Sequence, residues 1–130
     1  MNEKLESMVL KDLNFDISDA SNILMTNARK RAKYGTILLK LQAKYDDLEL
    51  DRKSKFGELW KYYTTDFDQI LDRRDVTYYI ESDIEYQKVL KKMNEVQRQI
   101  KFIDEVLHSL KNLSFEMNGV IKWEMYQNGE

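Results

Sequence analysis

Residues 82–126 read SDIEYQKVLKKMNEVQRQIKFIDEVLHSLKNLSFEMNGVIKWEMY, with one glycine and no proline. Apolar residues recur here at alternating steps of four and three, the spacing of one face of an α-helix. This seam consists of Val89, Met93, Val96, Ile100, Ile103, Leu107 and Leu110. Ser82 and Glu85 have the spacing of an N-terminal capping box. The pattern predicts one long helix over about 82–126.

Such a helix would be roughly 65 Å long, whereas a compact domain of this size has a radius of gyration of about 14 Å. Further apolar residues of the same segment lie outside the seam, namely Tyr86, Leu90, Phe102, Val106, Leu113 and Val120. A helix that is apolar on more than one face needs more than one partner. We therefore expect an elongated protomer that forms a homo-oligomer, with the seam residues as oligomerisation contacts.

The rest of the chain also has helical patterns. Residues 3–13 predict a short amphipathic helix. Residues 18–63 predict a second helical segment, for which Ser18 is a candidate N-cap and which Gly35 is expected to kink or break. Residues 64–81 lose the long periodicity and predict a connector with one or two short helical turns. The expected fold is an all-α, single helical domain over residues 1–130.

Composition agrees with this class. The 130 residues include no proline, no cysteine and four glycines, and 34% are charged. Strands and tight hairpins need more turn residues than this. The absence of cysteine excludes disulfides and thiolate metal sites and fits a reducing cytoplasm. No apolar run is long enough to span a membrane, and the N-terminus lacks the apolar region of a secretory signal.

Residues typical of catalysis are scarce. His108 is the only histidine, so the common zinc sites cannot form, and no nucleotide-binding glycine motif occurs. The carboxylates at 81, 83 and 85 are explained by the favourable interaction of acids with a helix start. We expect neither an enzyme nor a metal or cofactor site.

Residues 55–67, KFGELWKYYTTDF, interleave lysines with aromatic rings. Phe56 and Tyr63 continue the buried stripe of the second helix, whereas Tyr62 points elsewhere. A positive groove with rings on which bases stack is typical of single-strand DNA binding. The candidate residues are Arg52, Lys53, Lys55, Lys61, Tyr62, Arg73 and Arg74. The cluster RKRAK at 29–33 is a further candidate, although a solvated helix face is the better explanation of it.

The runs KYYTTDFDQILDRRDVTYYIESDIEYQKVLKKM and LSFEMNGVIKWEMYQNG resemble the phage recombination mediators of the UvsY type, over about residues 20–130. Tyr62 and Tyr63 match a tyrosine pair of that family, which basic residues precede. Gly57 and Leu59 stand here where basic residues would be expected.

The resemblance implies a small non-enzymatic protein that forms a homo-oligomeric ring in the cytoplasm of the infected bacterial host. It implies binding to single-stranded DNA and to the phage single-strand binding protein. Its role would be to help load a RecA-like recombinase in place of that protein during recombination and repair. The alternative is a structural coiled-coil scaffold or chaperone with no nucleic-acid role, which the net charge of −2 favours.

Overall fold

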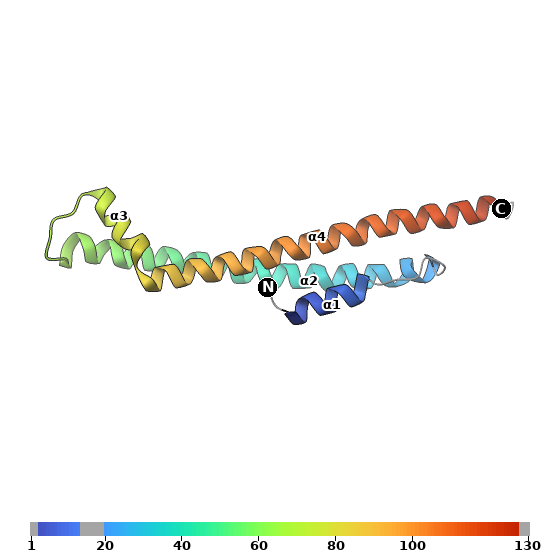
Figure 1. Cartoon of the computed structure of the whole chain (residues 1–130), viewed down its shortest axis with the longest axis horizontal. Coiled ribbons are helices and arrows are strands. Elements are labelled where there is room, and N and C mark those ends of the chain that lie inside the picture. Colours follow the sequence, from blue (N-terminus) through green and yellow to red (C-terminus); the bar gives the residue numbers. More distant parts are fainter. Residues whose placement is uncertain (1–2, 14–19, 128–130) are drawn as a thin grey trace. The chain divides into compact units, whose positions relative to one another are not determined.

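The computed structural model describes residues 3–13 and 20–127, and most of them are helical (Figure 1). The α-helices are α1 (Glu3–Leu13), α2 (Ala20–Lys61), α3 (Arg73–Ser82) and α4 (Ile84–Gln127), and a π-helical turn (Tyr62–Asp66) follows α2 directly. The described part of the chain contains no strand. The predicted all-α class and the predicted long C-terminal helix are confirmed.

Two local features differ from the prediction, and a third falls on a residue that the structure does not describe. Helix α3, of ten residues, forms within the segment predicted as a connector with one or two short helical turns. Ser82 belongs to α3, where its Oγ donates to the Tyr78 carbonyl oxygen at 2.8 Å. The cap of α4 is therefore Asp83, whose Oδ1 accepts from the Tyr86 amide at 2.9 Å, and the predicted Ser82 capping box is wrong. The candidate N-cap Ser18 lies outside the described residues.

Helix α2 continues through Gly35 without interruption. A side chain at position 35 would meet no atom within 4 Å. The expected break at this glycine is therefore wrong, because α2 runs through it as one helix.

The chain divides into two compact units, of which the first joins Met1–Lys40 to Gln99–Glu130. Ile23 and Leu24 contact the cluster of Leu113 and Met117, and Asn27, about one turn later on α2, contacts Leu110, which lies earlier on α4. The two helices therefore run antiparallel in this unit. Tyr34 of α2 is also buried there.

Asn27 is the one buried polar residue among those described. Its Nδ2 donates to the Leu110 carbonyl oxygen at 2.8 Å and to Ser114 Oγ, both on α4. Its Oδ1 is buried with no partner among the described residues. A buried amide in an apolar helix seam favours the one alignment that satisfies it, so Asn27 helps set the register of α2 on α4 in this unit.

The second unit, Leu41–Arg98, has a core of its own. Leu59 of α2, Val76 and Ile80 of α3, and Tyr86 of α4 form one buried cluster. The partly buried side chains packed against this cluster are Phe56, Trp60, Tyr63, Leu71 and Leu90. Three helices therefore share one small core in this unit.

Much of the predicted oligomerisation seam is covered within a single chain. Met93, Val96, Ile103 and Leu110 are buried, and Val89, Ile100 and Leu107 are half-buried. Three residues outside that seam, Tyr86, Val106 and Leu113, are buried as well. Packing within the protomer thus accounts for most of the apolar surface from which we argued for further copies, and homo-oligomerisation stays a prediction.

We predict that Asn27→Asp destabilises the fold at neutral pH. A carboxylate there would be buried and would face the Leu110 carbonyl oxygen in place of the amide donor, at a cost of about 2–4 kcal/mol. Burial would raise the pKa of the new carboxyl group. The penalty should therefore shrink as the pH falls to about 4, where the group is protonated.

Thermal unfolding at both pH values measures the effect, and Asn94→Asp on the exposed side of α4 is the control. Equal melting temperatures for the two variants at neutral pH would contradict the role given to Asn27.

Candidate nucleic-acid interface

Two tyrosine pairs, 16 residues apart in the sequence, meet in the second unit. The ring centroids of Tyr62 and Tyr63 are 4.9 Å apart, and Tyr63 stacks on Tyr79 at 5.3 Å with an interplanar angle of 28°. Tyr78 follows at 6.1 Å from Tyr79. Phe67 contacts three of these rings, at 5.2–6.1 Å. We call Tyr62, Tyr63, Tyr79 and Tyr78, in this spatial order, the tyrosine row.

Local backbone structure brings the two pairs together. The first pair begins the π-helical turn, in which the Phe67 amide donates to the Tyr62 carbonyl oxygen at 2.9 Å. π-helical turns are rare in proteins, and those that occur often lie at functional sites. The second pair lies on α3, which Asp72 caps by accepting from the Asp75 amide at 3.0 Å.

The inner and outer rings of the row differ in environment. Tyr63 is half-buried, and this burial, with the Asp83 carboxylate and the neighbouring tyrosines, raises the pKa of its hydroxyl. Tyr62 is 46% exposed and Tyr78 is 67% exposed. Tyr79 is 37% exposed and is stacked on Tyr63, so the inner pair is more enclosed than the two outer rings.

Arg52 differs from the other predicted cations because it is held in place. Its Nη2 and Nε donate to the two carboxylate oxygens of Glu49 at 2.7 and 3.1 Å. Its Nη1 donates to the hydroxyl of the buried Tyr86 at 3.3 Å. The hydrogen bonds with Glu49 are the main reason why the Arg52 pKa is raised and the Glu49 pKa is lowered. Arg52 thus links α2 to α4, a structural role that the sequence did not reveal.

The remaining candidates lie closer to solvent. Lys55 is half-buried, and its Nζ lies 3.9 Å from Glu58 Oε2. The others are exposed: Lys53 and Lys61 on α2, and Arg73 and Arg74 on α3. Residues 61–75 also carry four aspartates, Asp66, Asp68, Asp72 and Asp75. The cations beside the tyrosine row are thus matched by carboxylates, and the distinctive feature of this surface is its rings.

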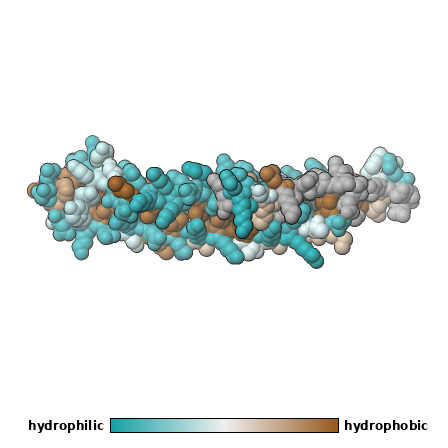
Figure 2. Space-filling model, turned by 60° about the horizontal axis from the view of Figure 1, so that its bottom comes forward, coloured by the Kyte–Doolittle hydropathy of each residue, from teal (hydrophilic) through white to brown (hydrophobic). Residues whose placement is uncertain are grey.

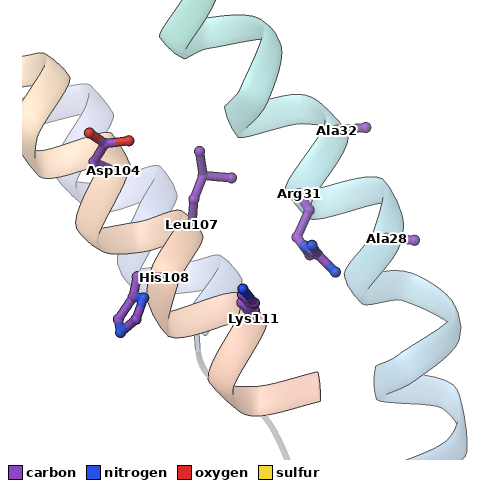
Figure 3. A pocket seen from close by; sticks show the side chains of 7 residues that line it. All are labelled: Ala28, Arg31, Ala32, Asp104, Leu107, His108 and Lys111. Carbon is purple, nitrogen blue, oxygen red and sulfur yellow. The ribbon is translucent and has the colours of Figure 1, made fainter. Parts of the chain in front are cut away.

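The cluster at 29–33 lies in the first unit. Lys33 Nζ is 5.2 Å from the centroid of the Tyr34 ring. Arg31 lines a groove of about 580 Å³ between α2 and α4 (Figure 3). The groove is lined by Ala28, Arg31, Ala32, Asp104, Leu107, His108 and Lys111. His108 is exposed there. Arg31 and Lys111 approach the groove from different helices, so this cluster remains the second candidate for anion binding.

Among the described residues, no group of three or more potential ligands is placed to hold a metal ion. None of the described helices is long and apolar enough to cross a membrane. On the face drawn in Figure 2, hydrophilic residues cover much of the surface and hydrophobic ones lie between them.

A protein-family model described as "Recombination, repair and ssDNA binding protein UvsY" matches residues 8–130. The chain belongs to the UvsY family. The expected family membership is therefore confirmed. No curated protein matches the chain.

Solved structures of this family have the same fold. The bacteriophage T4 recombination mediator protein UvsY in lattice type IV has a TM-score of 0.86 at 16% identity, covering 98% of this chain and 99% of that one. Its lattice type I form has a TM-score of 0.83 at 15% identity, covering 96% and 99% of the two chains. At this identity the likeness is one of fold, so the binding residues have to be argued from the side chains of this chain.

The sequence predicted only part of this candidate surface. It proposed Tyr62, Arg73 and Arg74 but passed over Tyr78, Tyr79 and Phe67. The signal that could have found the two tyrosines is that they form a second pair, whose first member follows Arg74 by four residues. On a helix, residues four apart share a face, so Arg74 and Tyr78 belong together.

We predict that Arg52→Ala lowers the melting temperature more than Lys53→Ala does. Both variants remove one positive charge, but only Arg52 satisfies the buried Tyr86 hydroxyl and the Glu49 carboxylate. The Glu49 pKa is lowered in the folded state. The interaction of Glu49 with Arg52 therefore stabilises the fold above the pKa that Glu49 has in the unfolded chain. This stabilisation is lost as the pH falls through the pKa that Glu49 has in the folded protein.

Melting curves from neutral to acidic pH test this, and the gap between the two variants should narrow on the acidic side. A larger loss for Lys53→Ala would contradict the structural role of Arg52.

Gly57 allows a gain-of-binding test, because a side chain there would meet nothing within 4 Å. Gly57→Lys and Gly57→Ala should both stabilise α2, by about 0.5–1 kcal/mol, since glycine disfavours a helix interior. Only the lysine adds a cation where the family pattern expects one. We therefore predict that Gly57→Lys alone tightens binding to single-stranded DNA, measured by fluorescence anisotropy. Equal affinities of the two variants would exclude this part of α2 from the interface.

Proposed function

We propose that this protein is a recombination mediator that binds single-stranded DNA. It helps load a RecA-like recombinase in place of the single-strand binding protein during DNA recombination and repair. It acts without catalysis, in the cytoplasm of an infected bacterial host. Membership of a family described as recombination, repair and ssDNA-binding proteins supports this proposal.

The observation that carries the proposal is the exposed Tyr62 ring beside Lys61. The sequence resemblance matches this ring to a tyrosine pair of the family, and its two described ring contacts are edge-on, at 74° and 63°. Its faces are thus free of parallel-stacked rings within the described part of the chain. Base stacking on an aromatic ring contributes about 1–3 kcal/mol and accepts any base, which suits a mediator with no sequence preference.

We further propose that the protein is a homo-oligomer, in the form of a ring. One protomer alone would bind weakly, because aspartates accompany the cations beside the tyrosine row. A binding surface that is repeated around a ring raises the effective concentration without any new contact. Large apolar side chains near the C-terminal end of α4 are exposed in the protomer and are available for such contacts. They are Phe115, Trp123, Met125 and Tyr126.

We predict that the protein binds single-stranded oligonucleotides more tightly than a duplex of the same length, since paired bases hide their faces. Affinity should fall as salt rises, because bound phosphates release counterions.

Replacing both arginines, Arg73→Ala with Arg74→Ala, should weaken binding and leave the helical fold intact, since both side chains are exposed.

Fluorescence anisotropy at two salt concentrations measures these affinities, and circular dichroism checks the fold. No binding to either nucleic acid would favour the structural scaffold instead. Equal affinity for single strand and duplex would remove the stacking argument.

A further inference from the structure

We propose that Tyr78 on α3 is a second base-stacking residue, which works with Arg74 one helical turn before it. This proposal rests on the proposed single-strand binding and names the surface of α3 that takes part in it. The ligand is a DNA base with the phosphate next to it.

The burial pattern of α3 shows where Tyr78 points. Val76 and Ile80 are 1% and 0% exposed, so they mark the side of α3 that faces the core. At about 100° per residue, Arg74 and Tyr78 project from the opposite side of the helix. Both are exposed, and Tyr78 is the most exposed ring of the tyrosine row. A cation and a ring one turn apart therefore face solvent together.

The ring geometry separates Tyr78 from its neighbour. Tyr79 is stacked on Tyr63 with an interplanar angle of 28°, so one of its faces is occupied. Tyr78 contacts Tyr79 with the planes at 79°, and it stacks in parallel on no ring in the described part of the chain. At the other end of the row, Tyr62 likewise makes only edge-on ring contacts within the described part of the chain. The inner pair therefore holds the row in place, and the two outer rings are left for ligand.

The charges beside the row favour ring-based recognition. Asp72 and Asp75 lie within one turn of Arg74 and offset part of its charge. A surface with this balance of charges would bind DNA only weakly through phosphate contacts alone, whereas base stacking does not depend on net charge. Binding should therefore distinguish a strand with bases from a strand without them.

The test compares oligo(dT) with an abasic strand of equal length, for the full-length protein and three variants. Wild type should prefer oligo(dT). Tyr78→Leu should weaken oligo(dT) binding by at least about fivefold, the effect of one lost stack, with little change for the abasic strand. Tyr78→Phe keeps the ring and should keep the preference. Arg74→Gln should weaken binding to both strands alike.

Circular dichroism and assembly mass confirm that each variant is folded and assembled, and Tyr78→Gln replaces Tyr78→Leu if leucine disturbs α3. An unchanged preference in the folded variant would overturn the proposal while single-strand binding stands. Equal wild-type affinity for both strands would also overturn it. If wild type bound neither strand, the proposed function itself would fail.

Discussion

The burial of Val76 and Ile80 is the contact on which the candidate interface depends. These two side chains fix α3 against Leu59 and Tyr86, and this places the second tyrosine pair next to the first. A short helix of ten residues is not stable in isolation, so its structure comes from this core. Loss of the small core would therefore separate the rings as well as lower stability.

Residues that look alike in the sequence have different roles in the structure. Arg52 and Lys53 are neighbouring cations, but the guanidinium group of Arg52 bridges Glu49 and Tyr86. Tyr62 and Tyr63 are neighbouring rings, but Tyr63 packs against the core cluster while Tyr62 is largely accessible. In both pairs a single step along the helix separates a structural side chain from one available for ligand.

The all-α class and the long C-terminal helix could be predicted because apolar periodicity and the absence of proline dominate the sequence. Helix α3 could not, since its apolar signal reduces to Val76 and Ile80, and both depend on residues distant in sequence. The capping residue of α4 was also mispredicted. Ser82 has the spacing of a capping box in the sequence, but Asp83 is the residue that caps α4 in the structure. Half of the tyrosine row was likewise missed, because it requires contact between α3 and the end of α2.

We expect single-stranded DNA to stack on the outer rings of the tyrosine row. Photo-crosslinking of the wild-type protein to oligonucleotides that carry 5-iododeoxyuridine, followed by mass spectrometry of the linked peptides, tests it most directly. We expect crosslinks at Tyr62 and Tyr78. Crosslinks confined to Trp123 and Tyr126 of α4, or to the 29–33 cluster, would contradict it.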